Sequence, residues 1–126
     1  MVEGKLGRIL VAEDNPDIRE IIQDLFETRG HKIFLAEDGA EAWRICQEPN
    51  SNLSLLLTDI DMPRMNGIEL IERVKKDYSN LPIVAYTGTH GYEARDAGAD
   101  YVLQKPCSNK VLVEKVEEAL NGKKQE

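Results

Sequence analysis

Short apolar runs alternate with amphipathic stretches along the chain. The runs are continuous rather than alternating with polar residues, which is typical of strands buried on both faces of a sheet. This pattern predicts five strands, at residues 8–12, 32–36, 53–57, 82–86 and 101–103.

A helix is predicted after each apolar run. In the first, apolar residues recur at i, i+3, i+4, i+7 and i+8, which places Ile18, Ile21, Ile22, Leu25 and Phe26 on one face. Asn15 is suited to cap this helix, and Gly30 is suited to end it. The remaining helices are predicted to begin near Asp38, Asn66, Gly91 and Ser108.

Strands alternating with helices predict one α/β domain with a parallel sheet covered on both faces. Right-handed crossovers then bring every strand to an end at the same edge, where ligands bind in such sheets. The 126 residues suit a single domain over 1–126. We expect its core to span about 7–121, followed by a frayed basic tail at 122–126.

Composition narrows the class of partner and the compartment. The 16 basic and 23 acidic residues give a net charge of −7, which argues against nucleic acid or an anionic membrane as a direct partner. The first residues lack the apolar run of a signal peptide, and no run is long enough to span a membrane. With only Cys46 and Cys107, no disulfide scaffold is expected, and we predict a cytoplasmic protein.

Side chains able to do chemistry follow four of the five predicted strands. They are Glu13 and Asp14, then Asp59 and Asp61, then Thr87, and finally Lys105 before Pro106. One acid at a strand end has an ordinary explanation, since acids also favour the start of a helix. The coincidence at four strand ends predicts a site.

The residue types at these strand ends suit phosphoryl transfer to an aspartate. Close carboxylates repel one another unless a cation lies among them, and hard oxygen ligands favour Mg²⁺. A lysine can pair with a carboxylate and then with an incoming anion, to which a threonine hydroxyl can also donate. One carboxylate then acts as the nucleophile, while the metal and the lysine offset charge on the phosphoryl oxygens.

Taken in order, the motifs resemble the response-regulator receiver domain of two-component signalling, which is CheY-like. The matching segments are ILVAEDN (9–15), LLLTDIDMPRMNGIEL (55–70), PIVAYTG (82–88), AGAD (97–100) and KP (105–106). The resemblance runs from Arg8 to about Leu120. It implies a flavodoxin-like sheet of order 2-1-3-4-5 with five helices, and a cis peptide bond at Lys105–Pro106.

The resemblance also implies a role for each site residue. Asp59 corresponds to the phosphoacceptor, and Thr87 and Lys105 to the residues that contact the phosphoryl group. The corresponding Mg²⁺ ligands are Glu13, Asp14, Asp59 and the backbone carbonyl of Asp61. The implied donor is a phosphohistidine on a histidine kinase or histidine phosphotransfer protein, and slow self-dephosphorylation follows. We expect a monomer or a weak phosphorylation-dependent dimer, either free-standing or linked to an output or kinase domain.

Some positions depart from the family pattern or affect the lifetime of the acyl phosphate. Val102 stands where the family usually has an aromatic residue, and Tyr101 is predicted to point to the opposite face of the sheet. Cys107 replaces a common Phe. Asp61 and Thr89 occupy positions that tune hydrolysis in the family. A separate expectation is that the two histidines, His31 and His90, are surface or loop residues, because neither has metal-ligand spacing.

Two other classes of protein share part of the pattern. A haloacid-dehalogenase-type phosphatase also places a D-x-D motif, here Asp59 and Asp61, after an apolar strand. That family has Thr or Val where this chain has Pro63, and it needs more chain for its cap. A flavodoxin needs a phosphate-binding loop after the first strand, where Glu13 and Asp14 repel a phosphate.

Overall fold

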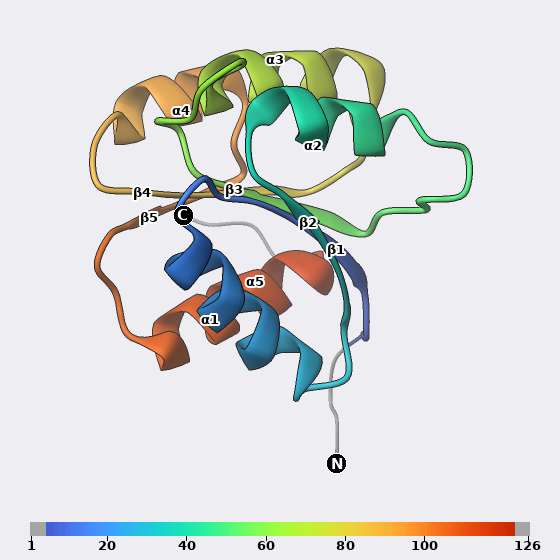
Figure 1. Cartoon of the computed structure of the whole chain (residues 1–126), viewed down its shortest axis with the longest axis vertical. Helices are drawn as coiled ribbons and strands as arrows, with labels where there is room; N and C mark the ends of the chain where they lie inside the picture. Colours follow the sequence, from blue (N-terminus) through green and yellow to red (C-terminus); the bar gives the residue numbers. More distant parts are fainter. Residues whose placement is uncertain (1–4, 123–126) are drawn as a thin grey trace.

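The computed structural model describes residues 5–122, which form a three-layer α/β domain (Figure 1). The elements are β1 (Arg8–Ala12), α1 (Pro16–Glu27), β2 (Lys32–Ala36), α2 (Gly39–Cys46), β3 (Leu55–Thr58), α3 (Gly67–Asp77), β4 (Ile83–Thr87), α4 (Gly91–Ala97), β5 (Tyr101–Gln104) and α5 (Asn109–Leu120). All strand pairs are parallel, and the order is β2-β1-β3-β4-β5. The predicted fold class and strand order are confirmed. Most of the tail predicted at 122–126 lies outside the described residues.

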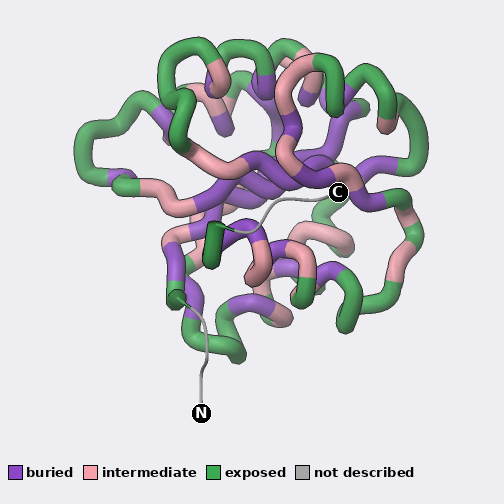
Figure 2. The backbone as a smooth tube through the Cα atoms, turned by 180° about the vertical axis from the view of Figure 1, so that it is seen from behind, coloured by how far each residue is buried: buried purple, intermediate pink, exposed green. Residues whose placement is uncertain are grey.

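Each face of the sheet has its own hydrophobic core. Helices α2, α3 and α4 cover one face, where Leu10, Leu56 and Leu70 are among the buried residues. Helices α1 and α5 cover the other face and bury Phe26 and Tyr101. Figure 2 shows buried backbone through the central strands and exposed backbone along the outer turns of the helices. A central strand packed on both faces gives the strand ends a rigid base.

Side-chain caps fix where four helices begin, as the sequence predicts. Their side-chain oxygens accept backbone N–H bonds in the first turn, from Asn15 on α1, Asp38 on α2, Asn66 on α3 and Ser108 on α5. All four caps stand in loops that follow the carboxyl ends of strands, at the ligand-binding edge of the sheet. They therefore hold those loops as well as the helices.

Three strands differ from their predicted bounds, and in β5 the difference is one added residue, Gln104, at the end. Strand β3 begins at Leu55 rather than at residue 53, because Asn52 adopts a positive φ of 46° and bends the chain. Strand β4 spans Ile83–Thr87 rather than 82–86, so Pro82 precedes it and Thr87 is its last residue. These differences leave the predicted site residues at the same edge.

The surface expectation for His31 is wrong, although the residue lies in a loop. Its side chain is fully buried, its Nδ1 accepts the Gly7 N–H at 3.0 Å, and its Nε2 lies 3.0 Å from Glu117 on α5. His31 therefore ties the start of β1 to α5. His90 is exposed, as expected.

The other local expectations are met. The Lys105–Pro106 bond is cis, and Cys46 and Cys107 are both free. Within residues 5–122, every helix is too short or too polar to cross a membrane.

Candidate functional site

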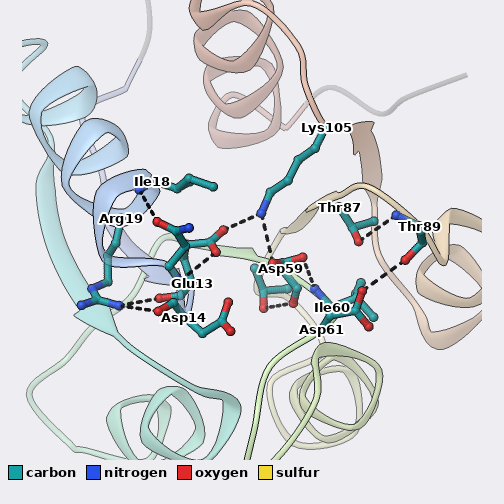
Figure 3. Close-up of polar contacts among 12 residues, drawn as sticks. Glu13, Asp14, Ile18, Arg19, Asp59, Ile60, Asp61, Thr87, Thr89 and Lys105 are labelled. Atoms are coloured by element: carbon teal, nitrogen blue, oxygen red, sulfur yellow. Dashed lines mark hydrogen bonds and ion pairs between the residues drawn. The ribbon is translucent and has the colours of Figure 1, made fainter.

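The carboxyl ends of β1, β3, β4 and β5 meet at one edge of the sheet (Figure 3). The parallel register pairs Ala12 with Thr58, so the residues that follow these two strands lie side by side. The Asp59 N–H donates to the Ala12 carbonyl at 2.9 Å, and the Lys105 N–H donates to the Thr87 carbonyl at 3.0 Å. Residues 46 positions apart in the chain are thereby brought into contact.

Three carboxylates form a cluster at this edge. Glu13, Asp14 and Asp59 each present an oxygen atom, and these atoms lie within 4.8 Å of one another. Glu13 is 2% exposed and Asp59 is 9% exposed, whereas Asp14 faces solvent. Hard oxygen donors with one side open suit a divalent cation such as Mg²⁺, which keeps several waters. The predicted acidic group therefore fits a metal.

Lys105 bridges the two buried carboxylates. Its Nζ lies 2.7 Å from Glu13 Oε1 and 3.0 Å from Asp59 Oδ2, and 5.3 Å from the centre of the Tyr86 ring. Burial alone lowers the pKa of Lys105, but the bonds to Glu13 and Asp59 outweigh burial, so the pKa lies above its ordinary value. The ammonium is therefore charged at neutral pH.

Burial has the opposite consequence for Glu13. Desolvation raises the pKa of its carboxyl above the ordinary value of 4.5, since the hydrogen bond and charge of Lys105 offset desolvation only in part. A second cation at the cluster would favour the ionised form of Glu13. A cation at this cluster would therefore offset the cost of burying the Glu13 carboxylate.

Several bonds fix Asp59 in place. Its Oδ1 accepts the Ile60 N–H at 2.6 Å, and its carbonyl accepts the Thr58 hydroxyl at 2.7 Å. The start of α3 packs directly against the same carbonyl, because a Cβ on Gly67 would collide with it. The carboxylate is thus presented to the edge of the sheet by a backbone with little freedom.

Thr87, Thr89 and Asp61 lie on the other side of Asp59. Thr87 is 2% exposed, and its Oγ1 accepts the Thr89 N–H at 3.4 Å. The Asp61 carboxylate points away from the acidic cluster, where it accepts the Thr89 hydroxyl at 3.1 Å and lies 3.3 Å from His90 Nε2. The Asp61 side chain is therefore directed to Thr89 and His90 and is not part of the acidic cluster.

Strand β5 shows the alternation that the sequence predicts. Tyr101 is buried against α1 and α5, and Val102 packs on the face that carries α2, α3 and α4. A cavity of about 450 Å³ lies beside Val102, lined also by Thr87 and by the exposed Tyr92 of α4. Space next to Thr87 is therefore open where the family usually places an aromatic ring.

Arg19 was missed by sequence reasoning. Its guanidinium, on α1, donates to the carbonyl of Glu13 at 2.8 Å. The amphipathic pattern predicts that an arginine on the polar side of this helix is exposed to solvent, so the sequence gives no signal for this contact. The contact joins the first turns of α1 to the loop that follows β1.

Sequence comparisons identify the family. The response regulator receiver domain matches residues 9–117 of the chain. A chemotaxis protein CheY homolog of Campylobacter jejuni is 37% identical over 120 residues, covering 90% of this chain and 92% of that protein. The response regulator receiver protein CpdR of Brucella abortus is 39% identical, covering 91% and 98%.

Other similar proteins give the structural and domain context. A CheY-like receiver domain from Methanospirillum hungatei superposes with a TM-score of 0.87 at 29% identity, covering 94% of this chain and 96% of that chain. The autoinducer sensor kinase/phosphatase CqsS of Vibrio cholerae is 34% identical over 86% of this chain, which spans only 17% of that protein. Receiver domains of this kind thus occur alone and within sensor kinases.

The chain belongs to the response regulator receiver domain family of two-component systems. This membership decides between the three classes considered from the sequence. The D-x-D motif of Asp59 and Asp61 is here part of a receiver motif, and the haloacid-dehalogenase and flavodoxin alternatives are set aside.

Proposed function

We propose that Asp59 accepts a phosphoryl group from a phosphohistidine on a histidine kinase or histidine phosphotransfer protein. The observation that carries this proposal is the shared position of Asp59, which belongs to the acidic cluster and also pairs with Lys105. A carboxylate in such a place can act as a nucleophile toward a dianionic group whose charge is met by nearby cations.

Glu13, Asp14 and Asp59, together with the backbone carbonyl of Asp61, are the proposed ligands of Mg²⁺. The spacing of the three carboxylate oxygens and the open side at Asp14 support this assignment. When bound, the metal offsets negative charge on the phosphoryl oxygens and holds the group in line with Asp59.

The proposed transfer is a single displacement at phosphorus. An Asp59 carboxylate oxygen forms a bond to phosphorus as the phosphorus–nitrogen bond of the donor breaks. The electron pair of that bond stays on the imidazole, which takes a proton from solvent. Lys105 and the Thr87 hydroxyl then donate to phosphoryl oxygens, and Lys105 can keep its bond to Glu13 while it does so.

The phosphorylated state would differ from the free state mainly in charge. The phosphoryl group carries about 1.5 to 2 negative charges in place of the single charge of the Asp59 carboxylate, and this charge attracts Lys105 and draws in Thr87. This biases two conformations of the domain and constitutes the signal. Water later attacks the phosphorus, so that inorganic phosphate leaves and the Asp59 carboxylate is restored. The chain thus promotes both its own phosphorylation and its slow dephosphorylation.

The proposal holds for a free-standing regulator and for a receiver within a longer chain, since the relatives include both. A cytoplasmic setting suits the two free cysteines. We propose a monomer, or a weak dimer that forms on phosphorylation.

Labelling with a small phosphodonor tests the proposal. Acetyl phosphate with MgCl₂ is expected to give an acid-stable, base-labile label on the wild type and none on Asp59→Asn. Asp61→Asn is the matched control, because only its backbone carbonyl is assigned to the site, and it should still be labelled. Equal labelling of wild type and Asp59→Asn would show that Asp59 is not the phosphoacceptor.

A further inference from the structure

Arg19 lies beside the loop that carries two of the three clustered carboxylates. Its Nη1 donates to the Glu13 carbonyl at 2.8 Å and reaches the Asp14 carbonyl at 3.5 Å (Figure 3). Its side chain is 18% exposed, so these bonds are largely sheltered from water. Its ion pair is with the exposed carboxylate of Glu37, at 4.0 Å, and not with a carboxylate of the cluster.

The other bonds of this loop show what Arg19 adds. The Glu13 N–H donates to the Ala36 carbonyl at 3.0 Å, which fixes one side of the residue. Glu13 Oε2 accepts the Asn15 N–H at 3.2 Å. The Glu13 carbonyl, in turn, accepts a hydrogen bond from the Arg19 guanidinium. A charged donor on a carbonyl makes one of the stronger hydrogen bonds in proteins.

The two cations at the cluster therefore act on different atoms. Lys105 bonds to carboxylate oxygens, the same atoms that a metal needs. Arg19 bonds to backbone carbonyls and leaves the carboxylate oxygens available. Lys105 offsets part of the negative charge of the cluster, and Arg19 holds the backbone of the loop that carries Glu13 and Asp14.

We infer that Arg19 is a positioning residue that fixes the Glu13–Asp14 loop in the geometry needed to bind the divalent cation. This inference rests on the proposed function, since it concerns the same site. Groups that orient metal ligands through a hydrogen bond contribute strongly to metal affinity, because the ligands are then held before the metal arrives.

Arg19 has two opposite effects on the affinity of the site for a cation. A positive guanidinium close to a cation site disfavours the cation, so loss of the charge alone would tighten binding. Loss of the anchor would weaken binding. The sign of the change in affinity thus separates the two effects.

The test uses the whole chain and MgCl₂ as the probe. NMR follows the backbone amides of Asn15 and Ile60 during titration of wild type, Arg19→Met and Arg19→Lys. Arg19→Met is expected to weaken Mg²⁺ binding about tenfold, in the range found when such orienting groups are removed. Arg19→Lys, which keeps a charged donor, is expected to recover part of the loss. Arg29→Met is the matched control, because Arg29 pairs with Glu117 at the other end of α1.

A second readout excludes a merely structural role. In labelling by acetyl phosphate, Arg19→Met should raise the Mg²⁺ concentration for half-maximal rate about tenfold, while the rate at saturating Mg²⁺ changes less than about twofold. Unchanged or tighter Mg²⁺ binding by folded Arg19→Met overturns the inference. If Arg19→Met does not fold, the test falls to Arg19→Lys. Wild-type Mg²⁺ affinity of Arg19→Lys, together with a wild-type Mg²⁺ dependence of labelling, then overturns the inference. Wild type that binds no Mg²⁺ defeats the proposed function itself.

Discussion

Lys105 sets the charge balance of the site at the scale of single residues. It is the cation that lies within hydrogen-bond distance of both buried carboxylates, Glu13 and Asp59. Its raised pKa means that its stabilising contribution is fully present below the ordinary pKa of lysine and is lost only as the pH rises through the raised value. At neutral pH the contribution is therefore complete.

Replacement of Lys105 by Met leaves the two desolvated carboxylates of Glu13 and Asp59 without the cation that bridges them. We expect Lys105→Met to lower the free energy of unfolding by about 1–3 kcal/mol in the presence of EDTA. MgCl₂ should stabilise this variant more than it stabilises the wild type, because the metal takes over the missing charge. Urea unfolding with EDTA or MgCl₂ measures both effects, with the exposed Lys110→Met as control. Equal stability of Lys105→Met and wild type in EDTA would contradict the shared-cation description.

His90 offers a residue-scale prediction next to the site. Its Nδ1 lies 3.0 Å from Glu93 Oε2, and this bond raises the pKa of His90 above its ordinary value of 6.5, with a further contribution from the Asp61 charge. The ion pairs of protonated His90 with Glu93 and Asp61 are therefore fully formed below pH 6.5, and they are lost as the pH rises through the raised pKa of His90. NMR titration should show a lower His90 pKa in Glu93→Gln than in wild type, and no change in that variant would count against the pair.

At the scale of elements, helix α3 and the loop after β3 depend on the size of residue 67. Gly67 stands where a Cβ would collide with the Asp59 carbonyl and the Ile60 backbone. Gly67→Ala should therefore displace Asp59, with slower labelling by acetyl phosphate and a loss of about 1–3 kcal/mol in unfolding free energy, as for an overpacked core. Gly88→Ala is the matched control for stability, because a Cβ there meets no described atom within 4 Å. Wild-type labelling by Gly67→Ala would show that the contact has no functional role.

Helix α5 is tied to the rest of the molecule by Glu117. Its carboxylate accepts two bonds from Arg29 at 2.8 Å and lies 3.0 Å from His31 Nε2. The bonds from Arg29, and then those with His31, lower the pKa of Glu117 below its ordinary value of 4.5. The stability contributed is present above that value and is lost as the pH falls through the lowered pKa.

Glu117→Gln should therefore lose about 1 kcal/mol of unfolding free energy at pH 7, a modest value because Arg29 is half-exposed. The difference from wild type should shrink below pH 4.5 as the wild-type carboxylate is protonated. Chemical denaturation across this pH range provides the measurement. A difference that stays constant into acid would mean that Glu117 acts through packing rather than charge.

The elements were predictable because their signals are local. Apolar runs, caps such as Asn15 and the glycine at Gly30 each act within a few residues, and the structure confirms them. The start of β3 was missed because the bend at Asn52 needs a left-handed residue, and Asn adopts that conformation only in some contexts. The loop position of His31 was predicted, but its burial was missed because its partners, Gly7 and Glu117, are distant in the chain.

The residues that meet at the site were predictable from the sequence, but their side-chain contacts were not. Parallel strands must end at one edge, so the meeting of Glu13, Asp59, Thr87 and Lys105 follows from their positions after apolar runs. Lys105 bonds to two carboxylates at once, and Arg19 bonds to a backbone carbonyl. Both contacts depend on side-chain conformations. Those conformations are set by packing between elements, which periodicity does not encode.

At the scale of the whole molecule, the excess of acidic residues divides into two parts. Most of the 23 acids lie on helices and caps, and some of these, such as Asp38 and Glu69, pair with arginines. Glu13, Asp14 and Asp59 instead gather at one edge, and Lys105 answers only part of their charge. The fold thus brings three of the acidic residues so close together that a cation would stabilise them.

A crystal structure of the protein with Mg²⁺ and beryllofluoride tests this account most directly. The account predicts beryllofluoride on an Asp59 carboxylate oxygen, with Lys105 and Thr87 donating to its fluorine atoms. Mg²⁺ should be coordinated by the carboxylates of Glu13, Asp14 and Asp59 and by the Asp61 carbonyl, directly or through water. Beryllofluoride on another residue, or a metal away from this cluster in crystals that hold both, would contradict it.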